Sequence, residues 1–424
     1  MRRLLPVSTA LLVTLTAVTL TAATLAAAGP ATATTKSSEA AMTAAGAGSG
    51  RYVPCNRPVA AGQARCLSIV HRSLTRTKAV GPFATAEAKA KAIPGLKPAD
   101  IRAAYRLPKT GAKNQTVAIV DAFDNPNVEK DLAVYRSVNH LPACTTANKC
   151  FRKVDQRGTK KYPEGDIGWG IEISLDVQAV SASCPGCKIL LVEADEPSTE
   201  DLGLAVNTAV RLGAKVISNS YGADESSADA AASKKYYTHP GVAIVASSGD
   251  YGFTAASAPA VMPNVWAIGG TLLNPTKTGY SEKAWEYAGS GCSAYVQKPA
   301  YQKDKNCGMR TISDLSAAAD SKDGFAVYDT YGQSELKDFG FVPVGNWIGV
   351  GGTSLSSPLI AGMIGLAGNA AKAAAPSYPY SHRSGLQDIV GGSNGYCGND
   401  YLCTGVKGYD GPTGLGSPRG LKSL

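Results

Sequence analysis

The chain has 424 residues, of which 44% are hydrophobic and 18% are charged, and this composition is that of a globular protein rather than a disordered one. The length suffices for one large α/β domain or two ordinary domains. The formal net charge of +9 is mild for this size and the chain has no long run of Lys and Arg, so we expect a solubilising surface and no nucleic-acid binding.

Residues 1–33 have the pattern of a secretory signal peptide. Arg2 and Arg3 precede an apolar run from residue 4 to about residue 25, and the small residues 31–33 follow. A membrane anchor is the alternative, but Thr and Ser interrupt the run, and no later segment reaches the roughly 18 apolar residues that a span requires. We therefore expect a secreted protein that no membrane holds after signal removal.

Residues 34–95 are rich in Ala, Gly, Ser, Thr and Lys and contain few large apolar side chains. Such a composition is typical of a weakly structured segment. We interpret it as a leader or short propeptide-like region and expect no active-site residue in it.

The ten cysteines fall into five neighbouring couples along the chain. An even number of cysteines in an exported chain predicts disulfides, although the sequence does not fix their connectivity. Closure of short loops is the simplest hypothesis, and it gives the couples Cys55/Cys66, Cys144/Cys150, Cys184/Cys187, Cys292/Cys307 and Cys397/Cys403. A redox or zinc half-site at residues 184–187 is the alternative, but neither a second CxxC motif nor a thioredoxin-like context supports it.

Residues 96–424 alternate between apolar strand-like runs and helical segments, which indicates a single α/β domain with a parallel sheet flanked by helices. The predicted strands are 116–120, 188–192, 215–217 and 242–246, and the predicted helices are 127–138, 170–182, 199–212 and 356–374. In such a sheet, functional side chains belong in the loops beyond the carboxyl ends of the strands.

The most specific motif is the string GGTSLSSP at residues 351–358, directly before the apolar predicted helix. A serine at a helix N-terminus beside glycines has free backbone amides and a favourable helix dipole for a developing oxyanion. An ordinary helix-capping serine would explain one serine but not the whole string. Ser354 is therefore the candidate nucleophile.

Glu172 and Asp176 lie four residues apart in the predicted helix 170–182 and therefore on one helix face. Two carboxyl groups so placed can share a proton, which raises their apparent pKa and orients one of them. Such a pair is usually a solvated helix face, but the remainder of this helix is too apolar for full exposure. The pair is a candidate proton acceptor for the serine.

The string at residues 352–358, together with VISNSYG at 216–222 and VAIVASSGDYG at 242–252, resembles the subtilisin-like clan of peptidases. In ordinary members the last string carries an Asn that donates to the oxyanion, whereas this chain has Asp250. Ordinary members also use a histidine in an H-G-T context, which none of the four histidines has, and we interpret each as a surface residue: His71, His140, His239 and His382. Asp121, where the clan places its triad aspartate, is interpreted as a structural or supporting acid.

The order Glu, Asp, Asp, Ser resembles the sedolisins, which are serine-carboxyl peptidases, over residues 96–424. The resemblance implies a subtilisin-like fold in which Ser354 attacks the scissile carbonyl, Glu172 takes its proton and Asp176 orients Glu172. It further implies that a protonated Asp250 and the Ser354 amide form the oxyanion hole, which favours activity at acid pH. Protein or peptide substrates, internal cleavage and a monomeric state are expected.

A C-terminal region rich in Gly and Asp predicts a calcium site. Two separated aspartates, glycine turns and free carbonyls suit this cation. The family resemblance implies ligation by the Asp388 and Asp410 side chains and by the carbonyls of Ile389, Val406 and Gly408. A glycine-rich surface turn is the alternative interpretation.

Two other functions stay open at this point. The first is an ordinary subtilase that uses an unrecognised histidine such as His140 or His239. The second is a secreted, non-catalytic binding protein with a peptidase scaffold, although such a protein would be expected to have lost one of the four site residues. An esterase is disfavoured because residues 352–356 do not supply a G-x-S-x-G motif.

Overall fold

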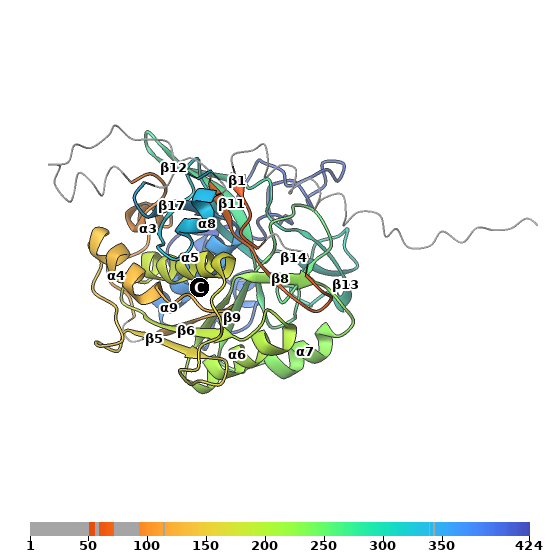
Figure 1. Ribbon diagram of the computed structural model, residues 1–424. Helices are drawn as coiled ribbons and strands as arrows, with labels where there is room; N and C mark the ends of the chain where they lie inside the picture. Colours follow the sequence, from red (N-terminus) through yellow and green to blue (C-terminus); the bar gives the residue numbers. More distant parts are fainter. Residues whose placement is uncertain (1–50, 56–58, 72–92, 113–114, 339, 342–343) are drawn as a thin grey trace, which may run out of the picture.

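The structure is a computed structural model that describes residues 51–55, 59–71, 93–112 and 115–424 except 339 and 342–343, so the predicted signal peptide lies outside the described residues. Its centre is an eight-stranded sheet in the order β12-β11-β9-β7-β4-β6-β5, with β15 also paired to β11 (Figure 1). All pairs are parallel except β11 with β12. The strands are β4 (Thr116–Ala122), β5 (Phe151–Asp155), β6 (Lys188–Ala194), β7 (Val216–Asn219), β9 (Ala243–Ser247), β11 (Trp266–Thr276), β12 (Gly279–Ala284) and β15 (Leu315–Asp320).

Helices cover both faces of this sheet, as the continuous apolar strands require. Alternate residues of β4 face opposite layers: Val117 and Ile119 pack with α5 and α9, whereas Ala118 and Val120 pack with α6. The helices are α3 (Pro98–Ala104), α4 (Val128–Val138), α5 (Ile167–Ser183), α6 (Thr199–Arg211), α7 (Asp229–Tyr236), α8 (Gln333–Asp338), α9 (Thr353–Ala367) and α10 (Tyr378–Ser381). The predicted α/β class with a parallel sheet flanked by helices is confirmed.

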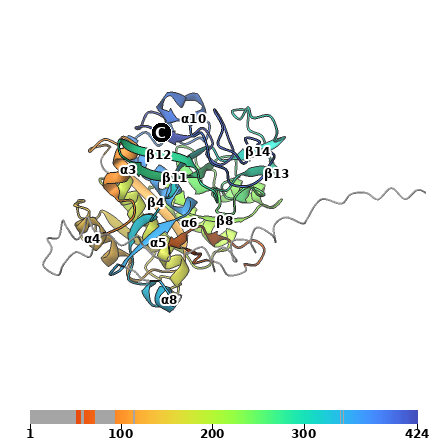
Figure 2. The same cartoon turned by 90° about the horizontal axis from the view of Figure 1, so that it is seen from above.

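Smaller strands surround this core. Antiparallel β13 (Gly291–Gln297) and β14 (Met309–Ile312) lie at the same end of the molecule as β8 (Tyr221–Asp224) in both views (Figures 1 and 2). The others are β10 (Ser257–Ala258), β16 (Phe325–Tyr328), β17 (Trp347–Gly351), β18 (Leu386–Gln387) and β19 (Ser417–Pro418).

Two helix starts differ from the sequence prediction by three residues. Helix α5 begins at Ile167 because the Asp166 carboxylate accepts a hydrogen bond from the Trp169 N–H at 2.9 Å and so caps the helix. Helix α9 begins at Thr353 and ends at Ala367, seven residues before the predicted end, because Gly368 caps it with a φ of +74° that suits glycine. The earlier start of α9 places Ser354 in its first turn.

The interpretation of residues 34–95 as weakly structured is wrong for residues 51–71 as far as they are described. Strand β1 (Arg51–Tyr52) pairs with β3 (Ile69–His71), β3 pairs with β17, and β2 (Arg65–Cys66) pairs with β8. Leu67, Ile69 and Val70 are buried. Non-local pairing supplies the order that the local composition does not indicate.

All five predicted cysteine couples are disulfide-bonded, with Cα–Cα distances from 4.8 to 5.9 Å. Each bond closes a loop of 3 to 15 residues in sequence separation. Among the described helices, none has the length and apolar character needed to cross a membrane.

Candidate active site

Ser354 is the second residue of α9 and is fully buried. Its backbone N–H belongs to the first turn, where no carbonyl of the same helix can accept it. Gly352 directly precedes the helix with a φ of +115°. A Cβ at Gly352 would lie 2.2 Å from the Leu67 carbonyl oxygen and 2.6 Å from Asp250 Oδ2, so only glycine fits here.

Glu172 and Asp176 face the same region from α5, which packs against α9. Both carboxyl groups are fully buried. Burial and then the charge of Asp121 raise the pKa of Glu172 well above its usual range, while the hydroxyls of Ser354 and Ser68 act in the opposite direction. Neither Glu172 oxygen has a well-formed hydrogen bond to the described residues, so no other group competes for a proton from Ser354 when Glu172 is ionised.

Asp176 is held in place by a hydroxyl group. Its Oδ1 accepts a hydrogen bond from Ser220 Oγ at 2.9 Å. Ser220 lies between β7 and β8, and its carbonyl oxygen is 3.3 Å from Ser354 Oγ. Burial raises the pKa of Asp176, and the charges of Asp121 and Glu172 raise it further.

Asp121, near the end of β4, is the third buried carboxyl group of this cluster. Burial raises its pKa to about 8, and neither of its oxygens has a hydrogen-bond partner in the described part of the chain. Because the charge of Asp121 raises the pKa of both Glu172 and Asp176, the three buried carboxyl groups cannot all be charged, and the cluster shares protons.

Asp250 follows β9, and its two carboxyl oxygens have different surroundings. Oδ1 accepts hydrogen bonds from the Thr353 backbone N–H at 2.8 Å and from Thr353 Oγ1 at 2.7 Å. Oδ2 is buried and has no partner among the described residues. Because burial raises the pKa of Asp250 to about 7, a proton on Oδ2 can be donated into the space beside the Ser354 amide.

The structure therefore brings together the four predicted site residues: Glu172 and Asp176 inside α5, Asp250 after the parallel strand β9, and Ser354 in the first turn of α9 after the antiparallel strand β17. The sequence interpretation missed Ser68, Ser220 and Thr353. Ser220 and Thr353 belong to strings already singled out, VISNSYG and GGTSLSSP, but Ser68 carries no signal of its own.

A family model described as the subtilase family matches residues 165–388, which is more than half of the chain and includes all four residues. The chain belongs to the subtilase family. Its relatives include sedolisin of Pseudomonas sp. (strain 101), 30% identical over 358 residues, which cover 72% of this chain and 56% of the relative. Kumamolisin of Bacillus sp. (strain MN-32) is 27% identical over 390 residues, which cover 82% of this chain and 66% of the relative.

A solved structure of a Pseudomonas sedolisin, described as a serine-carboxyl proteinase complexed with two molecules of pseudo-iodotyrostatin, superimposes with a TM-score of 0.62. It is 27% identical in sequence, and the match covers 77% of this chain and 95% of that one. The resemblance to the sedolisins and the subtilisin-like fold are thereby confirmed. The chain nevertheless spans little more than half the length of the curated sedolisin.

The histidines of this sedolisin homologue do not approach the nucleophile. His140 and His382 are exposed, and His239 bonds the Tyr236 carbonyl. His71 is not the surface residue that the sequence suggested, because its Nε2 lies 2.8 Å from Oδ1 of the buried Asp320 and its side chain is only 9% exposed. None of the four hydrogen-bonds Ser354 in the described part of the chain.

The predicted calcium ligands of this sedolisin homologue occupy two neighbouring loops. Asp388 Oδ2 accepts from the Gly408 N–H at 2.9 Å and Asp410 Oδ2 accepts from the Val406 N–H at 3.1 Å. Burial raises the pKa of Asp410 to about 7, and the nearby Asp388 charge adds to this shift. Two converging carboxyl groups of this kind suit a divalent cation.

The carbonyl oxygens of Ile389, Val406 and Gly408 accept no hydrogen bond from the described part of the chain. They therefore remain available to a cation, and the donor set fits an all-oxygen calcium site. No group of three or more His, Cys, Asp or Glu side chains suited to a metal occurs among the described residues.

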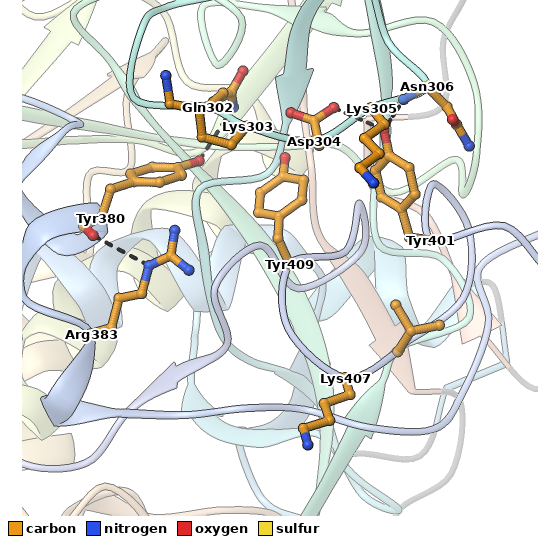
Figure 3. A pocket seen from close by; sticks show the side chains of 11 residues that line it. Gln302, Lys303, Asp304, Lys305, Asn306, Tyr380, Arg383, Tyr401, Lys407 and Tyr409 are labelled. Carbon is orange, nitrogen blue, oxygen red and sulfur yellow. Dashed lines mark hydrogen bonds between the residues drawn. The ribbon is translucent and has the colours of Figure 1, made fainter.

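Two cavities in the described part of the chain are not lined by Ser354. One, of about 410 Å³, is lined by basic and tyrosine side chains beside the Val406 loop, and Figure 3 shows Tyr380, Tyr401 and Tyr409 facing residues 302–306 across it. The other, of about 480 Å³, lies between Pro54–Cys55, residues 63–65 and the start of α5.

Proposed function

We propose that this protein is a secreted serine-carboxyl endopeptidase that hydrolyses peptide bonds of proteins at acid pH through an acyl-enzyme on Ser354. The observation that carries the proposal is the pair of acids around Ser354: Glu172 beside its hydroxyl and Asp250 beside its amide. Kinship with peptidases of the sedolisin type supports the reaction class.

The reaction follows from the contacts. Ser354 Oγ attacks the scissile carbonyl carbon while Glu172 takes the hydroxyl proton, and Asp176, held by Ser220, orients Glu172 within the shared-proton cluster. The carbonyl oxygen becomes an oxyanion that accepts from the Ser354 N–H and the protonated Oδ2 of Asp250. Glu172 then gives the proton to the leaving amine, and a water molecule repeats the sequence on the acyl-enzyme.

Secretion is proposed from the signal-peptide pattern and is supported by the five disulfides, which persist in oxidising compartments. Asp388, Asp410 and the three carbonyls of Ile389, Val406 and Gly408 would hold calcium and tie two C-terminal loops together. No catalytic step involves it. A monomeric state remains our expectation.

The pH dependence of hydrolysis tests the proposal, because Asp250 must be protonated to donate. Its pKa is raised to about 7, so the donor is present below this pH and is lost as the pH rises through it. We expect hydrolysis of denatured casein, assayed from about pH 3 to about pH 9, to fall about tenfold per pH unit above this pKa. Asp250→Asn keeps the Thr353 contacts and supplies a permanent N–H donor, so the decline at high pH should disappear.

Asp250→Ala is the matched control, because it lacks any donor: relative to the unaltered protein it should lose activity by about 10² to 10³ below about pH 7, and this difference should shrink above about pH 7, where Asp250 itself ionises. A neutral optimum, or an Asp250→Asn profile that falls in parallel with the unaltered protein, would contradict the assigned role. Absence of hydrolysis at every pH would favour the non-catalytic binding protein.

Removal of calcium should lower the melting temperature. A cation at a hundred times its dissociation constant stabilises the folded state by about 2.7 kcal/mol, so EDTA is expected to lower the Tm by several degrees. Calcium rather than magnesium should restore it, since the site offers carbonyls and flexible loops instead of a compact octahedron. The double variant Asp388→Asn, Asp410→Asn should melt at the same temperature with and without EDTA; equal Tm values for the unaltered protein in both buffers would contradict the site.

A further inference from the structure

Residues 65–71 run in an extended conformation through the active site of their own chain. On one side, β2 pairs antiparallel with β8, with Arg65 opposite Gly222 and Cys66 opposite Tyr221. On the other side, β3 pairs antiparallel with β17, the strand that leads into Ser354, with Ile69 opposite Gly351. The two residues between these strands, Leu67 and Ser68, therefore cross directly over the nucleophile.

The carbonyl group of Leu67 occupies the candidate oxyanion hole. Its oxygen accepts a hydrogen bond from the Ser354 backbone N–H at 3.1 Å, and the Leu67 N–H donates to the Ser220 carbonyl at 3.3 Å. The same oxygen and the unpartnered Oδ2 of Asp250 face the narrow space beside Gly352 that a Cβ would fill. Both donors that the reaction requires therefore converge on this carbonyl.

The next residue contacts the base. The hydroxyls of Ser68 and Ser354 both lie near the Glu172 carboxyl, and both lower its pKa. Ser68 also supplies the backbone nitrogen that would leave if the Leu67–Ser68 bond were cut. Glu172 is thus next to both the attacking hydroxyl and the residue that would carry the leaving amine.

Side chains fix this register. Leu67 is 3% exposed, and its Cδ1 would lie 3.2 Å from a Cβ at Gly222, so its side chain is buried tightly against this glycine. Arg65 donates to the Tyr251 hydroxyl at 3.3 Å. The peptide lies in one defined position rather than loosely over the cleft.

Both flanks of the segment are anchored. The Cys55–Cys66 disulfide and the contact of Arg51 with the buried Asp320 at 3.0 Å hold the upstream half. The downstream half is held by His71, whose Nε2 lies 2.8 Å from the same Asp320. Both cysteines precede Leu67, so the disulfide would not join the two halves after a cut between Leu67 and Ser68. Another protein could not enter the cleft while both halves are in place.

We propose that Leu67–Ser68 is the bond at which this chain cuts itself, and that residues 65–71 block the cleft until they do so. The inference rests on the proposed peptidase function. Ser354 Oγ bonds to the Leu67 carbonyl carbon, the carbon–nitrogen bond to Ser68 breaks, and the Ser68 amine takes the proton from Glu172. Water then hydrolyses the Leu67 ester, which regenerates Ser354 and leaves an upstream chain that ends at Leu67.

The position of Leu67 also indicates the substrate class. The buried space that holds its side chain lies against Gly222, so proteins with a leucine-like side chain before the scissile bond should be preferred. Upstream of it the chain continues through the bridge of Gln63 with Ser198, and the Ala64 N–H donates to the Pro197 carbonyl at 2.7 Å. A substrate can therefore extend well beyond three residues on this side, which favours internal cleavage.

The test follows the N-terminus of the secreted full-length chain during incubation at pH 4, using intact mass and N-terminal sequencing at two concentrations tenfold apart. The unaltered protein should yield a chain that begins Ser68-Ile69-Val70, with the same half-life at both concentrations, and casein hydrolysis should appear with a lag that tracks this product. Ser354→Ala should remain uncut.

Two substitutions at Leu67 separate chemistry from folding. Leu67→Met keeps an apolar side chain of similar size, so self-cleavage should stay within about threefold. Leu67→Asp places a carboxylate in this buried position, so cleavage should slow by about 100-fold or more. Equal melting temperatures of the two uncut proteins show that the loss is not one of folding.

Casein hydrolysis with the Leu67–Ser68 bond intact would overturn the inference and leave the proposed function standing. Cleavage of that bond in Ser354→Ala, or a rate proportional to concentration, would overturn cleavage within one chain. Failure to cut either casein or the chain itself would overturn the proposed function and the inference with it.

Discussion

Replacing Ser354 with alanine is expected to lower kcat/KM for casein by about 10⁴-fold or more, because nucleophile, base and oxyanion donors act as a unit and no other group replaces the hydroxyl. Ser354 is buried in the first turn of α9, with its Oγ 3.3 Å from the Ser220 carbonyl oxygen and beside the Glu172 carboxyl. Its removal leaves the fold intact because alanine suits a helix. Initial rates at acid pH, with the melting temperature as the check on folding, give the measurement.

Ser357→Ala is the matched control on the same helix. Ser357 is also buried, and its hydroxyl bonds only Ser218, at 3.0 Å, among the described residues. Loss of one such bond costs about 1 kcal/mol of stability and leaves the reacting groups in place, so activity should stay within about tenfold. Equal losses in the two variants would mean that Ser354 acts through packing and not as the nucleophile.

The sequence predicted the central sheet because its strands are continuous apolar runs. Val117, Ile119 and their counterparts are buried on both faces, which requires flanking helices. Two of the site residues were predictable for a related reason: Glu172 and Asp176 are the only ionisable residues of α5, a helix that is otherwise uncharged and is buried along nearly its whole length. A polar residue kept in such a place indicates chemistry or a specific hydrogen bond.

The segment around Leu67 could not be predicted from its composition. Its strands are only two or three residues long, too short for any periodic pattern, and their partners β8 and β17 lie far along the chain. One signal was available: the predicted Cys55–Cys66 couple implied a constrained loop inside a region otherwise interpreted as a weakly structured leader. Ser68 and His71 are ordinary residues whose positions depend on that pairing.

The assignment of Glu172 as the base predicts the second large loss of activity. Glu172→Gln keeps the shape of the side chain but cannot accept the Ser354 proton, so kcat/KM for casein is expected to fall by about 10³ to 10⁴ at every pH. Folding should not suffer, because a neutral amide carries a smaller desolvation cost than a carboxylate in this fully buried position. The measurement is a pH–rate profile of the variant beside its melting curve.

Glu193→Gln provides the comparison for Glu172→Gln. Glu193 is also a fully buried glutamate, and burial raises its pKa to about 9, but it lies at the end of β6 with Lys153 at 3.5 Å and does not contact Ser354. A general electrostatic role of buried carboxyl groups would make the two variants equally slow, whereas a specific base makes only Glu172→Gln slow.

Near-normal activity of Glu172→Gln would mean that another residue is the base. His71, which bonds the buried Asp320, would then be the first residue to replace. A cut between Leu67 and Ser68 keeps His71 in the chain, three residues after the new N-terminus, so a histidine base is compatible with self-cleavage and the variants alone decide between the two bases.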